Sequence, residues 1–133
     1  MAGKHENLIF TDLPQMVDLP SHFHPVPFWV TPQMGEDIKL GVAAVDTSTL
    51  VGEYLTDEHG HDCAEVYMAL SPNKGDMVLE ITLDDETYVV ESPCVIYVPA
   101  GVRHRFKTLK SERKGSYFYG IILDMENVRD TRS

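Results

Sequence analysis

The sequence has few cysteines, few basic residues and no long hydrophobic run. Cys63 and Cys94 are the only cysteines among 133 residues, which excludes a disulfide framework and favours a reduced, cytoplasmic setting. There are 11 Lys and Arg against 21 Asp and Glu, giving a net charge of −10. An acidic surface repels phosphate backbones and anionic lipid headgroups, so neither nucleic acid nor a membrane is an expected partner.

Segments that could target or span a membrane are also missing from the sequence. The N-terminal residues, MAGKHENLIF, lack the apolar core of a secretion signal. The longest apolar stretch near the C-terminus is YFYGIIL at 117–123, far too short for a transmembrane helix. Both observations agree with a cytoplasmic location.

Sustained helical periodicity is absent, and short β-type runs take its place. From about residue 40, stretches rich in Val, Ile, Tyr and Phe alternate with turn-forming residues. Eight strands are predicted, at 40–45, 49–55, 65–70, 77–83, 87–90, 94–98, 103–109 and 117–123. Short strands spaced by roughly ten residues are typical of an all-β sandwich or barrel. The length suits one domain, and we place the barrel at residues 37–125, followed by a C-terminal tail at 126–133.

The first 36 residues have a different composition. The stretch 13–35 contains five prolines, which oppose a continuous helix and any central strand. It also contains Phe23, Phe28 and Trp29, side chains apolar enough to need cover. We therefore predict that residues 1–36 form an extended arm lying across the barrel or across a second subunit.

Two histidines and a glutamate gather in the stretch HGHDCAE at 59–65. On a strand, His59 and His61 leave the same face with Cα atoms roughly 6.6 Å apart, so both rings could reach one ion. An extended chain would place Glu65 roughly 20 Å from His59. For Glu65 to join the site, the backbone must turn between His61 and Glu65.

A further imidazole is offered by VPAGVRHRF at 98–106. Pro99 and Gly101 favour a tight turn, and His104 follows as the next strand begins. On that strand Phe106 would share the face of His104, while the arginines at 103 and 105 would point the other way.

The two stretches together resemble the two motifs of the cupin superfamily. The resemblance rests on H-x-H-x3-E at His59, His61 and Glu65, followed by P-x-G-x2-H ending at His104. It implies a double-stranded β-helix, or jelly-roll-like, barrel in which His59, His61, Glu65 and His104 bind a divalent metal. The segments at 64–70 and 95–105 also look like parts of archaeal-type phosphoglucose isomerase, itself a cupin. The resemblance further implies a homodimer.

Three imidazoles and one carboxylate suit Fe, Mn, Ni, Zn or Co as the divalent ion. The favoured function is a metal-dependent enzyme acting on a small polar metabolite that chelates the metal through oxygen atoms, as a dioxygenase, isomerase or lyase. Two alternatives stay open: a non-catalytic small-molecule-binding module, and a sugar-phosphate isomerase. Because the fold hosts many reactions, sequence alone does not choose among them.

Three further side chains are candidates for the substrate pocket. Tyr67 lies two residues after Glu65 and would share its face, so we expect Glu65 to act as a base and Tyr67 to orient the substrate. Tyr54 and Phe106 are expected to line the same pocket.

Two other patterns favour structural roles. His22 and His24 form a second H-x-H without a glutamate at the matching distance, and prolines surround them, so we assign them to the arm. Six of the eleven cations fall within 103–114. Strand alternation puts the first three on the outer face, which predicts a solvated surface and not an anion site.

Overall fold

Two antiparallel sheets make up most of the molecule. The computed structural model describes residues 4–11, 15–19, 21–30, 39–112, 114–127 and 130–131. The larger sheet has the strand order β1-β2-β3-β10-β5-β8. Its strands span Gln15–Val17, Val26–Val30, Gly41–Val45, Tyr117–Ile122, Glu65–Leu70 and Cys94–Val98 in that order. The smaller sheet has the order β7-β6-β9, with strands at Glu86–Glu91, Met77–Leu83 and His104–Ser111.

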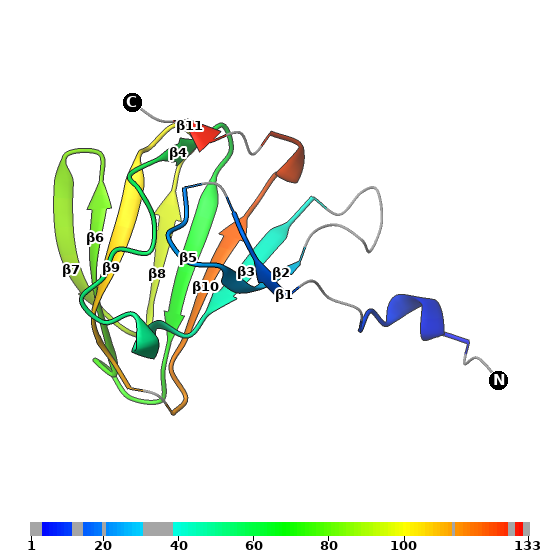
Figure 1. Ribbon diagram of the computed structural model, residues 1–133, viewed down its shortest axis with the longest axis horizontal. Helices are drawn as coiled ribbons and strands as arrows, with labels where there is room; N and C mark the ends of the chain where they lie inside the picture. The colour runs from blue at the N-terminus through cyan, green and yellow to red at the C-terminus, as the bar shows by residue number, and fades with distance from the viewer. Residues whose placement is uncertain are drawn as a thin grey trace.

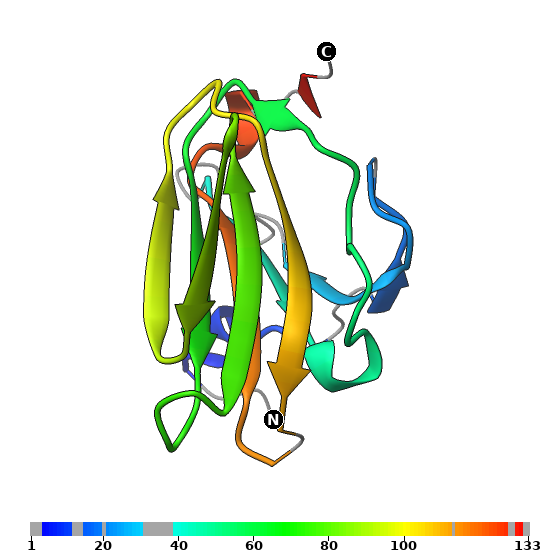
Figure 2. The same ribbon diagram turned by 90° about the vertical axis from the view of Figure 1, so that its left-hand side faces the viewer.

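Short elements complete the described structure. A third pair joins β4 (Gly60–His61) to β11 (Asp130–Thr131). Three 3-10 turns follow the order η1 (Glu6–Leu8), η2 (Thr47–Thr49) and η3 (Met125–Asn127). Figure 1 shows the strands side by side with η1 standing away from them, and Figure 2 shows β6, β7 and β9 in the foreground.

The core lies between the inner faces of the two sheets. In β5 and β6 every second residue is buried, as the alternating strand geometry requires. Met77, Leu79 and Ile81 are almost completely buried and pack with Phe106 and Phe118. The all-β prediction is confirmed, and its core is an apolar interior shared by both sheets.

Most of the predicted strands match, and one does not. The strands at 65–70, 77–83 and 94–98 have the predicted bounds. The predicted strand at 49–55 is wrong, because that segment makes only single bridges, Val51 with Thr108 and Tyr54 with Lys107. Here the chain runs along β9 without a continuous ladder, and Gly52 adopts a positive φ of 86° that interrupts extended geometry.

The proline-rich N-terminal region contains strands that belong to the larger sheet. Contrary to the prediction that prolines exclude a central strand, β2 lies between β1 and β3 although it contains Pro27. Its registered pairing with β3 begins at Phe28, so the missing N–H of Pro27 falls before that ladder.

The remaining parts of the predicted arm fall partly outside the described structure. Residues 4–11 are exposed, and Phe23 is exposed as well. Residues 1–3, 12–14, 20 and 31–38 lie outside the described residues, as do the side chains of Phe28 and Trp29. Residues 128–129 and 132–133 of the predicted tail lie outside them too, while Asp130 pairs with His61 of β4.

The sequence predicts that the two cysteines form no disulfide framework and that no segment spans a membrane. Cys63 and Cys94 are free thiols, and burial raises the pKa of each, which keeps them in the unreactive protonated form. None of the helical segments described is long and apolar enough to cross a membrane.

The outer face of the larger sheet is apolar. On β3, β10, β5 and β8 the registers align a set of side chains that point away from the core. This outer set consists of Val42, Ala44, Val66, Met68, Leu70, Val95, Tyr97, Tyr117, Tyr119 and Ile121. None of its members is charged, although the chain carries a net charge of −10. Two acidic copies could approach closely there without bringing like charges together.

We expect the predicted homodimer to use this outer set. Tyr97 on the edge strand β8 is 61% exposed, so Tyr97→Glu would place a charge in the interface and give a monomer. Val89→Glu, on β7 of the other sheet and 64% exposed, should leave the dimer intact. Sedimentation equilibrium of the three proteins measures the result. A monomeric parent protein, or equal masses for both variants, would contradict the expectation.

The described core packing predicts how two substitutions change the free energy of unfolding. Ile81 is 2% exposed in the middle of β6, so Ile81→Ala should lower the free energy of unfolding by about 2–5 kcal/mol. Val89→Ala on exposed β7 should change it by less than about 0.5 kcal/mol. Urea unfolding followed by circular dichroism compares them, and similar effects for the two variants would argue against the described core.

Candidate metal centre

The two histidine stretches meet directly through their backbones. His59 N–H donates to His104 O at 3.2 Å, and His104 N–H donates to His59 O at 2.7 Å. These two bonds form an antiparallel bridge between segments 45 residues apart in the sequence. Gly101 N–H also donates to His61 O at 2.8 Å, so the turn that precedes β9 is fixed against β4.

Three imidazoles converge at this junction. The ring centroids of His59, His61 and His104 lie 4.6–5.2 Å apart. Each ring offers one nitrogen, and these nitrogens all lie within 4.8 Å of one another. The side chains are buried, with His104 at 0% and His59 at 1% exposure. Imidazole nitrogens at this spacing could hold a metal ion.

Backbone carbonyls select the tautomers of two of these rings. His59 Nδ1 lies 2.7 Å from Asp57 O, and His104 Nδ1 lies 3.0 Å from Val102 O. A carbonyl oxygen only accepts, so each Nδ1 must carry the proton that it donates. In the neutral ring the lone pair is then on Nε2, the arrangement found in histidines that bind metals.

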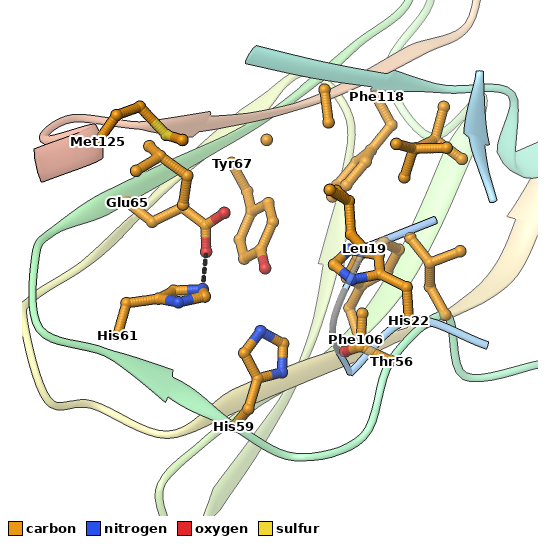
Figure 3. A pocket seen from close by; sticks show the side chains of 16 residues that line it. Leu19, His22, Thr56, His59, His61, Glu65, Tyr67, Phe106, Phe118 and Met125 are labelled. Atoms are coloured by element: carbon orange, nitrogen blue, oxygen red, sulfur yellow. Dashed lines mark ion pairs between the residues drawn. The ribbon is translucent and has the colours of Figure 1, made fainter. Parts of the chain in front are cut away.

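Glu65 brings a carboxylate to the same point. It is the first residue of β5, and its Oε1 lies 3.0 Å from His104 Nε2 and 3.5 Å from His61 Nε2; Figure 3 draws the contact with His61. Burial raises the pKa of Glu65, but His104 and His61 beside it outweigh burial and lower the pKa to about 2. The carboxylate is therefore ionised at neutral pH.

The contact between Glu65 and His104 provides a test of fit for a cation. Glu65 Oε1 and His104 Nε2 are buried, and neither makes a hydrogen bond within the described part of the chain. Positive charge between Glu65 and His104 stabilises the carboxylate; in the neutral His104 ring with its proton on Nδ1, two lone pairs would instead face each other at 3.0 Å and repel. A bound cation removes that repulsion, so the donor set of three imidazoles and one carboxylate fits a divalent metal.

A cavity of about 400 Å³ adjoins this cluster. Tyr67 and Phe106, both predicted pocket residues, line it together with His59, His61 and Glu65. Tyr67 packs against His104, Phe106 and Phe118 with centroid distances of 5.4–5.7 Å. In Figure 3 its hydroxyl points toward the middle of the cavity.

Gly120 of β10 makes room for the two β5 side chains. A Cβ at this position would lie 3.3 Å from Tyr67 Cε1 and 3.5 Å from Glu65 Oε2. A larger residue would press on the tyrosine ring and crowd the carboxylate. The glycine therefore preserves the space in which Glu65 and Tyr67 face the cavity.

Tyr54 lies elsewhere, which corrects its predicted place in the pocket. Its ring packs under Arg105 and Lys107 on the outer side of β9, with the guanidinium carbon 4.1 Å and the Lys Nζ 4.4 Å from the ring centroid. Its hydroxyl donates to Glu80 Oε1 at 3.4 Å. The inward position belongs to the next residue, Leu55, which is buried and lines the cavity.

His22, which the sequence analysis assigned to the arm, faces the cavity, as do Leu19 and Val26 of the same region. It lines the cavity, with its ring centroid 6.2 Å from that of His59. His24 instead lies 4.0 Å from Glu53 Oε1 near the surface. The H-x-H pattern marked both residues, but only the bridge between His22 and Thr56 decides which of them faces inward.

Comparisons with known proteins support the fold. No protein-family model matches the sequence, and no curated protein matches it by sequence. A cupin 2 domain-containing protein from Halorhodospira halophila has a similar structure, with a TM-score of 0.56, 17% identity, and coverage of 79% of this chain and 67% of that one. A cupin-like protein from Thermotoga maritima gives a TM-score of 0.56 at 9% identity, covering 88% of this chain and 81% of that one. Likeness at such identities establishes architecture and not a reaction: the chain has the cupin fold, an all-β double-stranded β-helix barrel.

Proposed function

We propose that this protein is a metal-dependent cupin enzyme that acts on a small molecule chelating the metal through oxygen atoms. The observation that carries the proposal is the buried cluster of His59, His61 and His104 beside ionised Glu65. Together these four side chains would hold an Fe, Mn, Ni, Zn or Co ion. Such an ion supplies a Lewis acid for isomerase or lyase chemistry and, when it is iron, a centre for dioxygenase chemistry.

The chain's own residues have distinct roles in this proposal. Glu65 is ionised and buried in the wall of the cavity, so it can accept a proton from a substrate carbon or hydroxyl as a general base. The Tyr67 hydroxyl extends into the cavity and can donate a hydrogen bond that orients the substrate. Phe106, Phe118 and Leu55 line the cavity with apolar surface, which excludes water from the reacting atoms.

A sugar phosphate fits this cavity poorly. Its described lining contains neither Lys nor Arg, the side chains that most often bind phosphate. Arg105 and Lys107 lie on the outer side against Tyr54, and Arg103 pairs with Glu58 at 3.5 Å. Among the described residues, the local sequence likeness to archaeal-type phosphoglucose isomerase is therefore not matched by a site for the phosphate group.

The metal proposal predicts which substitutions abolish metal binding. His61→Ala and His104→Ala should each lose at least about 90% of the bound metal, because a site reduced to three donors binds far more weakly. His24→Ala removes an imidazole outside the cluster and should keep the full content. Elemental analysis of purified protein by mass spectrometry measures the metal. Equal content in all four proteins would refute the site.

The catalytic proposal predicts a different effect for Tyr67→Phe. This change keeps the ring that packs on Phe106 and Phe118, so metal content and thermal stability should stay the same. Loss of one oriented hydrogen bond should lower kcat/KM by about tenfold.

Activity would first be found with the protein loaded with each candidate metal. Oxygen uptake and product NMR would be measured against hydroxy acids, diketones and sugar phosphates. Turnover of any chelating compound supports the enzyme. Stoichiometric metal and tight ligand binding without turnover would instead identify the non-catalytic binding module.

A further inference from the structure

A buried hydroxyl in the cavity is not used by the proposed metal chemistry. Thr56 is 2% exposed, lines the cavity, and its Oγ1 has no hydrogen-bond partner among the residues that the structure describes. A buried polar group left without a partner destabilises the folded chain. Since Thr56 also lines the cavity, we consider a ligand group as the partner of this hydroxyl.

His22 lies next to Thr56 on the same wall. The two residues form an antiparallel bridge, and two backbone bonds fix the segment on either side. Phe23 N–H donates to Leu55 O at 3.0 Å, and Asp57 N–H donates to Ser21 O at 2.9 Å. Figure 3 shows the His22 ring turned into the cavity on the side opposite Glu65. The N-terminal segment thus contributes a held polar side chain to this wall.

Apolar side chains make up much of the cavity wall. Val26, Val45 and Leu55 line the cavity with the rings of Phe106 and Phe118. His22 and His59 are 6.2 Å apart between ring centroids, a span of a few carbon atoms. A ligand reaching both ends needs a largely apolar middle portion, because most of the lining apart from the Tyr67 hydroxyl offers it no hydrogen bonds.

We propose that Thr56 and His22 form a second polar subsite, and that the ligand is bifunctional. One end carries oxygen atoms that chelate the metal, the middle is a short hydrocarbon, and the far end carries a neutral hydrogen-bonding group such as a hydroxyl. The inference rests on the proposed metal function for the first end only. It narrows the expected small polar metabolite to a molecule with two polar ends.

A series of hydroxamates tests the subsite on the Zn-loaded protein. Acetohydroxamate reports chelation alone, and butano-, pentano- and hexanohydroxamate add the hydrocarbon. The same three chains with a terminal hydroxyl add the far group. Isothermal titration calorimetry should show that each buried methylene tightens binding by about fourfold. At one chain length, the terminal hydroxyl should tighten binding by a further factor of about five to ten.

Two variants assign the effect to the named side chains. Thr56→Val and His22→Leu should keep the zinc and the affinity for acetohydroxamate, and should lose the gain from the terminal hydroxyl. Thr47→Val is the matched control, since Thr47 is also 2% exposed but its hydroxyl bonds to Ser111 Oγ at 3.0 Å. The control should keep the hydroxyl gain and melt at a lower temperature, whereas Thr56→Val should melt at an equal or higher one.

The outcomes separate this inference from the proposed function. If the protein retains no zinc, or acetohydroxamate does not bind, the metal proposal fails. If both bind but the terminal hydroxyl adds nothing at any length, the second subsite is refuted and the metal centre stands. Persistence of the hydroxyl gain in both Thr56→Val and His22→Leu would also overturn the assignment.

Discussion

Burial of the Glu65 charge is the constraint on which the site depends. An ionised carboxylate taken out of water loses several kcal/mol of hydration unless positive charge or hydrogen bonds replace it. Here the side chains that face it are His104 at 3.0 Å and His61 at 3.5 Å. Two backbone carbonyls draw the protons of His59 and His104 to Nδ1. The arrangement therefore favours a cation shared by the imidazoles and the carboxylate.

The backbone explains how such an arrangement survives in an apolar interior. His59 and His104 exchange two hydrogen bonds, and Glu65 begins a strand whose alternate residues are buried. Each donor is thus held by sheet geometry, and none depends on a mobile loop for its position. Preorganised donors of this kind lose little conformational entropy when a metal binds.

Sequence reasoning succeeded where the signal was local. Strands at 65–70 and 94–98 could be predicted because β-branched and aromatic runs end at turn-forming residues. The convergence of His59 and His61 follows from strand periodicity, whereas their meeting with His104 came from the resemblance. Fold class and the histidine cluster were accessible for these reasons.

The predictions that failed concern which face of a strand a residue occupies and which distant segments of the chain pair with each other. Between residues 49 and 55 an interrupted ladder shifts the inward position from Tyr54 to Leu55, and composition contains no information about such a shift. His22 faces the cavity because its segment pairs with residues 55–57. That pairing joins parts of the chain more than thirty residues apart, so no local pattern around His22 predicts it.

Chemistry and ligand selection lie on different parts of the chain in this arrangement. The proposed metal ligands belong to β4, β5 and β9 and their junctions, whereas His22 comes from the segment between β1 and β2. Substitutions in that segment can change the far wall of the cavity while the bridge between His59 and His104 keeps its own two backbone hydrogen bonds. Since one donor set serves many reactions on this fold, the wall that receives the other end of the ligand is where specificity would be decided.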